Sequence, residues 1–506
     1  MVEKWTLFNA PSGVSADTVI LLTDGSVLVH NADFPGSPGT GGRDWYRLKP
    51  DDNGAYDSGT WSGALNMATG RQYFGSGVLR DGRVYVIGGE YSNLFAKDLN
   101  ILGEIFDPDT ELWSPMNKPT PDFDFIAGDC MSVVMADGRV LVGGASSSRT
   151  AIWDSELDLW TESGLGFTLG GAQTKTGSSG EESWALMPDG TVLTVSVPNP
   201  GTAQKYVPTL DKWVNTGVVQ NLVVSSIAGT DVGEFGPLIL VPDGRMLAIG
   251  GNGRTALYSS GATPSAAGTW ANGLDFPKDK GMFAPVGFMT ALDAPATLLP
   301  NGQVMCLAGK TDKYDVPDEP LSYWSKPTTF FLYDPVANTL TQMIEQPYGF
   351  FPVTESDTWT GCLCLLPNGR VLYTKQDNTI AMYSPDAAEL TPNNTWRPTL
   401  SSCPSKLVVG HVHDISGTQF NGLSQGNAYG DDRQNSTNFP LVQLTDSAGK
   451  IKYLKTFSFS TMGVATGASV VSAKIKIHSA LPVGSYSMVV IANAIASTPI
   501  NVTVVT

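Results

Sequence analysis

Cysteine and histidine are scarce in this sequence of 506 residues, which has five cysteines and four histidines. An odd and widely spaced set of cysteines argues against a disulfide framework. Cys362 and Cys364 lie two residues apart on an expected strand, and we expect buried apolar thiols there rather than a metal pair. Sustained helical periodicity, heptads and apolar runs long enough to cross a bilayer are also missing. The sequence therefore predicts neither a disulfide scaffold, a coiled coil nor a membrane span.

Basic side chains are too few to balance the acids. The chain has 31 Lys and Arg against 48 Asp and Glu, a formal net charge of −17. Such a surface repels phosphate backbones, so we expect no nucleic-acid partner. The N-terminus shows no signal peptide, which predicts a cytoplasmic protein unless a leader has been removed.

Glycine, in contrast, is abundant, and it marks a repeat. An Asp-Gly or Asn-Gly pair recurs seven times between two apolar runs, at steps of 52 to 67 residues. Such a pair predicts a tight hairpin, because Gly accepts a positive φ and Asp tolerates one. The pairs are Asp24-Gly25, Asp81-Gly82, Asp137-Gly138, Asp189-Gly190, Asp243-Gly244, Asn301-Gly302 and Asn368-Gly369. Four short strands per unit at this spacing predict an all-β, seven-bladed, kelch-type β-propeller.

Two domains are expected. Residues 5–8 resemble the outer strands of the repeat but precede the first turn, so we expect them to complete the seventh blade. The period stops near residues 394–398, and short alternating strands follow. We assign residues 1–395 to the propeller and residues 396–506 to an immunoglobulin-like β-sandwich.

The chain resembles the galactose oxidase and glyoxal oxidase family of copper-radical enzymes, which have a kelch propeller and an immunoglobulin-like domain. The most specific similarity is C-terminal, in Gly422-Leu423-Ser424-Gln425-Gly426, Ala428-Tyr429-Gly430-Asp431-Asp432 and Thr437-Asn438-Phe439-Pro440. Similar runs open the C-terminal domain of bacterial kelch proteins of this group. The resemblance implies an oxidase fold, and it allows the family's copper ligands to be placed on this chain.

The resemblance implies a copper ion held by two tyrosines and two histidines, with one tyrosine linked to a cysteine. Tyr73 falls at the cross-linked tyrosine, and Ala16 at its cysteine partner. Tyr91 takes the position of the family's stacking tryptophan. The adjacent Tyr-His pair is replaced by Trp359-Thr360, and the last histidine falls near Phe459. Because Trp, Thr and Phe do not replace these donors, copper is not expected and no other cofactor is predicted.

Polar side chains gather at the equivalent pole. The residues eight positions before the seven turns are Ala16, Tyr73, Asp129, Glu181, Phe235, Asp293 and Thr360. Glu234 is a neighbour, and Arg71 and Arg254 are the basic residues expected to stabilise these acids, unless a bound cation or raised pKa values do so. The acids could instead hydrogen-bond backbone N–H groups where strands begin. Asp431 and Asp432 could bind Ca²⁺, but capping a turn is the preferred interpretation.

The aromatic residues Tyr73, Tyr91 and Trp359 beside these acids are typical of a surface that stacks sugar rings and bonds their hydroxyls. We therefore expect a non-catalytic binding or structural protein that engages a glycan or a protein partner at the pole. Two alternatives stay open. One is an enzyme, either of the oxidase type or a metal-independent carbohydrate-active enzyme with Asp129, Glu181 or Asp293 as acid or base. The other is a component of a larger assembly.

Overall fold

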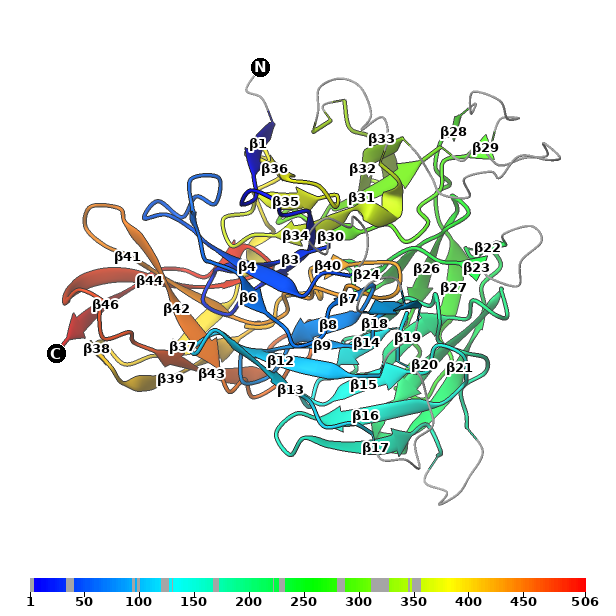
Figure 1. Ribbon diagram of the computed structural model, residues 1–506, viewed down its shortest axis with the longest axis horizontal. Coiled ribbons are helices and arrows are strands. Elements are labelled where there is room, and N and C mark those ends of the chain that lie inside the picture. Colours follow the sequence, from blue (N-terminus) through cyan, green and yellow to red (C-terminus); the bar gives the residue numbers. More distant parts are fainter. Residues whose placement is uncertain are drawn as a thin grey trace.

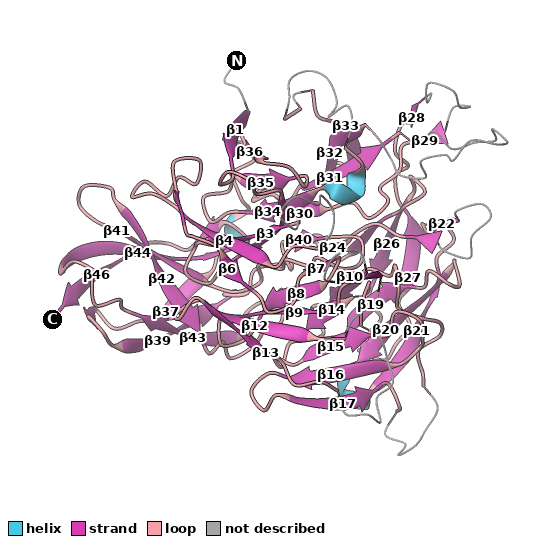
Figure 2. Ribbon diagram, viewed as in Figure 1, coloured by secondary structure: helices cyan, strands magenta, loops and turns pink. Residues whose placement is uncertain are grey.

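A computed structural model describes residues 4–32, 41–92, 96–97, 101–119, 127–129, 131–166, 173–221, 223–226, 233–279, 287–310, 327–344, 346–347 and 356–506. Strands dominate these residues, together with three short 3₁₀ helices, η1 (Pro208–Leu210), η2 (Thr358–Thr360) and η3 (Asn394–Trp396) (Figure 2). The prediction of an all-β chain with a seven-bladed propeller and a C-terminal β domain is confirmed. No helix within the described ranges is long and apolar enough to cross a membrane.

Each blade is an antiparallel sheet whose first strand faces the ring centre. Blade one is β2 (Ala16–Leu21), β3 (Val27–Asn31), β4 (Asp44–Lys49) and β5 (Thr60–Trp61), and β6 (Leu65–Asn66) also pairs with β4. Blade two is β8 (Gly75–Val78), β9 (Val84–Ile87), β12 (Gly103–Asp107) and β13 (Leu112–Pro115). Blade three is β14 (Ser132–Val134), β15 (Val140–Gly143), β16 (Thr150–Asp154) and β17 (Leu159–Ser163). Blades four and five are β18 (Trp184–Leu186), β19 (Val192–Val195), β20 (Thr202–Val207) and β21 (Lys212–Val218), then β24 (Leu238–Leu240), β25 (Met246–Ile249), β26 (Thr255–Ser259) and β27 (Thr269–Asn272). Blade six is β30 (Ala296–Leu298), β31 (Val304–Gly309), β32 (Thr328–Asp334) and β33 (Thr339–Gln342).

Blade seven joins the two ends of the propeller chain. It consists of β34 (Cys362–Leu365), β35 (Val371–Thr374), β36 (Thr379–Tyr383) and the N-terminal strand β1 (Trp5–Asn9). Trp5 lies opposite Tyr383 in this pairing and packs edge-on against Phe330 of blade six, with ring centroids 5.0 Å apart. The first strand of the chain is thus the outer strand of the last blade (Figure 1).

The seven Asx-Gly turns share one geometry. Every turn glycine has a positive φ, between 77° and 92°. Its N–H donates to the carbonyl three residues earlier at 2.9–3.0 Å, as Gly25 does to Leu22. The Asx side chain accepts from the N–H two residues on, at 3.0–3.1 Å. None of the seven Asx residues has a positive φ, so these are three-residue loops in which glycine alone is left-handed.

The C-terminal domain is a curled nine-stranded sheet that packs against the turns of the first three blades (Figure 1). Its order is β37 (Thr399–Ser402), β39 (Val412–Thr418), β43 (Val470–Lys476), β42 (Ile451–Phe457), β41 (Leu441–Thr445), β44 (Gly484–Ala492), β46 (Ile500–Val505) and β38 (Lys406–Val408), with β45 (Ile495–Ala496) on β44. The N–H groups of Thr456, Phe459 and Met462 donate to Thr23, Arg80 and Ala136, which lie at the turns of blades one to three.

One segment of this domain, residues 422–438, enters the centre of the ring; we call it the plug. Its strand β40 (Asn427–Ala428) pairs with β30, the inner strand of blade six. Asn435 donates to the carbonyls of Val19 and Leu363, in blades one and seven, at 2.8 and 2.7 Å. Gln425 accepts from the N–H of Leu186 in blade four at 2.7 Å. The polar plug therefore satisfies backbone groups on the central edge of the inner strands, where no further strand of the same blade follows.

Candidate functional site

A cavity of about 480 Å³ opens at the pole where the plug ends. Its described lining consists of Gln72, Tyr73, Glu90, Tyr91, Asp129, Glu181, Glu234, Asp293, Trp359, Gln376, Tyr429, Asp431 and Asp432. Seven of these thirteen residues are acids and none is Lys, Arg or His. The lining is therefore rich in acids, and it includes seven of the nine predicted site residues.

Four predicted positions reach the cavity through an unusual backbone conformation. Tyr73, Asp129, Glu181 and Asp293 each lie eight residues before a turn, and their φ angles are 53°, 54°, 61° and 44°. A left-handed conformation costs a non-glycine residue about 1 kcal/mol or more, and such residues gather at functional sites. This feature recurs in blades two, three, four and six. In each of them it directs a phenol or a carboxylate into the cavity.

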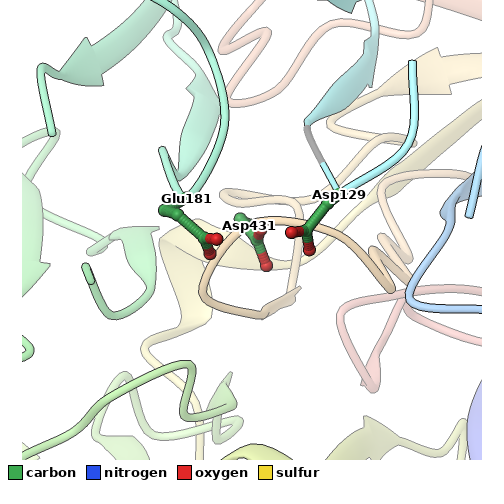
Figure 3. A group of neighbouring side chains, drawn as sticks. All are labelled: Asp129, Glu181 and Asp431. Carbon is green, nitrogen blue, oxygen red and sulfur yellow. The ribbon is translucent and has the colours of Figure 1, made fainter. Parts of the chain in front are cut away.

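The carboxylates form two overlapping groups. One oxygen from each of Asp129, Glu181 and Asp431 lies within 4.8 Å of the others, and the same holds for Glu181, Glu234 and Asp293. Figure 3 shows the side chains of Asp129 and Glu181 reaching toward each other from different blades, with Asp431 of the plug between them. Glu181 belongs to both groups and therefore lies at the centre of the acidic half of the cavity.

Burial and mutual repulsion shift the pKa values of these acids upward. Burial, and then the charges of Asp129 and Glu234, hold the pKa of Glu181 well above its ordinary value. Burial, with Asp431 adding repulsion, raises the pKa of Glu234 to about 8. Burial also raises the pKa of Asp431 to about 6, and burial and neighbouring acids raise the pKa of Asp293 and Asp432 strongly. Several of these carboxyl groups therefore stay protonated near neutral pH unless a bound cation or a donor stabilises the charged form.

The opposite half of the cavity is aromatic. Tyr73 meets Tyr91 and Trp359 edge-on, with ring centroids 6.1 and 5.8 Å apart and interplanar angles of 72° and 76°. Tyr91 begins β10 (Tyr91–Ser92), which pairs with β7 (Arg71–Gln72), and Trp359 is the middle residue of η2. The three rings are only half-buried, so part of each ring surface remains available to a ligand.

Arg433 of the plug supports the floor of the cavity. Its guanidinium donates to Asp17 and to the carbonyls of Trp359 and Gly361, and it lies 4.2 Å from the ring centroid of Tyr429. Tyr429 in turn donates to the carbonyl of Trp359 at 2.7 Å. The plug thereby holds the aromatic half in place and brings Asp431 and Asp432 to the acidic half.

Two predicted site residues lie elsewhere. Arg71 is fully buried, where it donates to the carbonyls of Gly88 and Leu102 and pairs with Glu104 at 3.0 Å. Arg254 is exposed and does not line the cavity. Neither arginine lines the cavity, so of the three expected ways of stabilising the pole acids this one has no support from the structure. Arg71 lies in β7, and its partners Gly88, Leu102 and Glu104 belong to nearby segments of the same chain that do not line the cavity.

The contribution of the C-terminal domain also differs from the prediction. Phe459, at the expected position of the last histidine, stacks on Phe439 with centroids 6.2 Å apart, near the turns of the blades. Asp431 and Asp432 were expected to cap a turn, but they are 2% and 1% exposed and line the cavity. Six lining residues lie outside the predicted set: Gln72, Glu90, Gln376, Tyr429, Asp431 and Asp432. The only signals that could have found them are proximity in sequence to predicted residues and the C-terminal motif that contains the last three.

Comparison with known proteins gives the fold a context. The chain resembles a copper alcohol oxidase. This solved structure is a fungal alcohol oxidase of the AA5 family in complex with copper, and the similarity covers 100% of both chains with a TM-score of 0.53 and 15% identity. A virginiamycin B lyase from Staphylococcus aureus matches 76% of this chain and 99% of its own, with a TM-score of 0.46 and 9% identity, which is too distant to carry an argument. No protein-family model matches the chain. No curated protein matches it.

At 15% identity the likeness to the oxidase shows the fold alone, so we tested the copper site against the residues present. The cavity offers carboxylate, phenol and amide groups in its described lining, but no imidazole or thiolate. His30 is fully buried and faces Asp17 at 3.2 Å and the carbonyl of Gly42 at 2.9 Å. Burial raises the pKa of Tyr73, which disfavours a phenolate ligand. A copper centre of the AA5 type does not fit this set of donors.

Proposed function

We propose that the protein is a binding protein on an oxidase-like scaffold, and that its pole cavity takes a small polyhydroxylated ligand such as the end of a glycan. One observation carries this proposal: half-buried aromatic rings face a group of carboxylates across a single cavity. Aromatic rings stack against the apolar faces of sugar rings, while carboxylates and amides bond the hydroxyls around them. The cavity volume also falls within the roughly 300–1,000 Å³ of small-molecule sites.

The charge of the cavity narrows the ligand class. A uronic or sialic acid would find no basic residue in the described lining and would be repelled by those of its seven acids that are ionised. Neutral sugars and amino sugars satisfy the same hydroxyl and stacking contacts without this repulsion, and an ammonium group would gain from it. We therefore expect neutral or cationic glycans to bind and acidic glycans to be rejected.

The test is a panel of neutral, amino and acidic oligosaccharides, screened on an array and measured by calorimetry with the full chain. Trp359→Ala should weaken the binding of the best ligand at least tenfold, because a ring of the aromatic half is lost. Trp270→Ala on β27, a half-buried tryptophan of an outer strand, is the matched control and should bind normally. Absence of binding to every glycan, or equal loss in both variants, would contradict the proposal.

A second candidate function uses the same cavity for acid–base chemistry on the bound sugar. It is favoured by the carboxylates of Glu181 and Glu234, which approach within 4.8 Å from neighbouring blades. Paired carboxyl groups can divide the roles of acid and base or nucleophile in glycoside cleavage. The binding function and the enzymatic function are distinguished by incubating the best ligand with the wild type and with Glu181→Gln and analysing the products. Turnover that Glu181→Gln abolishes, with binding retained, would favour the enzyme.

A further inference from the structure

The geometry points to a binding site for a hard divalent cation of the Ca²⁺ type in the acidic half of the cavity, with Asp129, Glu181 and Asp431 as its first ligands. The second group, Glu181, Glu234 and Asp293, adjoins it through the shared Glu181. The cation site goes beyond the glycan proposal, because it needs no sugar to be occupied. A cation there would join blade three, blade four and the plug.

The spacing of the oxygens suits such an ion. Ca²⁺ binds six to eight oxygens at about 2.3–2.6 Å, so oxygens on opposite sides of the ion lie roughly 4.6–5.2 Å apart. The nearest oxygens of Asp129, Glu181 and Asp431 all lie within 4.8 Å of one another. Figure 3 shows the carboxylates of Asp129 and Glu181 directed toward Asp431, which lies between them.

Unsatisfied buried oxygens are the second, independent observation. Asp431 is 2% exposed, and its Oδ2 has no hydrogen-bond partner among the described residues. The residue Asp293 is 8% exposed, and its Oδ1 also has no hydrogen-bond partner among the described residues. Gln72, a lining residue that is not an acid, is 1% exposed and both polar atoms of its amide lack partners in the described chain. Buried polar atoms in native proteins are normally satisfied, so these atoms indicate an external partner.

Among the described residues, the two buried cations nearest the acidic half are engaged by other partners. Arg433 is fully buried beside the plug acids, but its guanidinium is engaged by Asp17, Trp359 and Gly361. Only its Nε approaches an acid of the cavity, Asp432, at 3.9 Å. Lys175 is paired with Glu182 at 2.9 Å, behind the cavity wall. Neither of these two cations therefore forms an ion pair with Glu181 or Asp431.

The donor chemistry selects the class of ion. Carboxylate and amide oxygens are hard ligands that suit Ca²⁺, Mg²⁺ or Mn²⁺, whereas Cu²⁺ and Zn²⁺ favour imidazole and thiolate. Mg²⁺ requires a compact octahedron with oxygens at about 2.0–2.1 Å and keeps several waters. Carboxylates that reach the site from separate blades and from the plug match the larger and more variable shell of Ca²⁺.

The experiment is calorimetry of the chelator-treated full chain with CaCl2, MgCl2 and CuCl2 in the absence of sugar. We expect one Ca²⁺ per chain, bound at least tenfold more tightly than Mg²⁺. Asp431→Asn and Asp129→Asn should each weaken Ca²⁺ at least tenfold. Asp414→Asn, which alters an exposed acid paired with Lys474 on the C-terminal sheet, is the matched control and should bind like the wild type.

Thermal unfolding distinguishes a loss of Ca²⁺ binding from a folding defect of the variant. Asp431→Asn should raise the Tm of the metal-free protein, because it removes repulsion, and should reduce the rise in Tm that CaCl2 gives the wild type. Failure of the folded wild type to bind Ca²⁺ at millimolar concentration would overturn the inference, as would wild-type affinity in both cavity variants. Glycan binding that persists in EDTA would leave the proposed function standing when this site fails.

Discussion

Arg433 of the plug and Asp17 of blade one form an ion pair in which both side chains are fully buried. Burial alone would raise the pKa of Asp17, but the charge of Arg433 and a bond from His30 lower it to about 2. His30 lies 3.2 Å from the other oxygen of Asp17, so this carboxylate is engaged on both sides. The pair connects the C-terminal domain to the first blade directly beneath the cavity.

Breaking this pair should destabilise the whole chain. Arg433→Met leaves Asp17 as an uncompensated buried charge, and we expect the free energy of unfolding to fall by about 3–5 kcal/mol. Denaturant unfolding followed by tryptophan fluorescence measures this. In the double variant Arg433→Met with Asp17→Asn no charge is stranded, so part of the loss should return. A single variant as stable as the wild type would show that the pair is not formed.

The same pair predicts an acid-sensitive component of stability. Asp17 has a folded-state pKa of about 2, below its ordinary value of 3.8. A lowered pKa stabilises the protein above the unfolded-state value, and this contribution is lost as the pH falls from about 4 toward 2. Its size is about 2 kcal/mol. Asp17→Asn should remove this component, so that the difference in stability between the variant and the wild type shrinks between pH 4 and pH 2. A difference that stays constant over this range would count against it.

The turn glycines should differ in sensitivity, although their backbone angles are alike. Gly244 has a φ of +87° and no atom within 4 Å of an added Cβ, so Gly244→Ala should cost only the left-handed strain of about 1–2 kcal/mol. At Gly25 an added Cβ would lie 2.5 Å from the ring of Tyr453 in the C-terminal domain. Gly25→Ala should therefore lower the Tm clearly more than Gly244→Ala. Equal effects would mean that the domain does not rest on this turn.

The N-terminal strand should be needed by the ring. Trp5 is 4% exposed and packs against Phe330 and Tyr383, so Trp5→Ala should lower the free energy of unfolding by about 3–5 kcal/mol. Leu7 lies on the same strand but is 47% exposed, and Leu7→Ala is the matched control with an effect well below that. Urea titration of both variants measures the difference, and similar losses would contradict the burial of Trp5 in blade seven.

The ring and much of the cavity could be predicted from the sequence because both repeat a local signal. Each Asx-Gly pair fixes its own hairpin through a glycine φ and one side-chain bond, and no distant contact is needed. Counting back from these turns locates Tyr73, Asp129, Glu181 and Asp293, since equivalent positions of the blades meet at one pole.

The plug could not be predicted in this way. Its place depends on bonds from residues such as Gln425 and Asn435 to backbone groups of separate blades, hundreds of residues away in some cases. No local period reports such contacts, so Asp431 and Asp432 were interpreted as turn residues. Arg71 was misplaced for a related reason, because its pairing with Glu104 depends on the fold of blade two.

The most direct measurement is a crystal structure of the full chain soaked with CaCl2 and the best-binding oligosaccharide. We predict a sugar ring against Trp359 and a cation between Asp129, Glu181 and Asp431. A cavity that stays empty at saturating ligand, or a copper ion bound beside Tyr73 after a parallel soak with CuCl2, would contradict it.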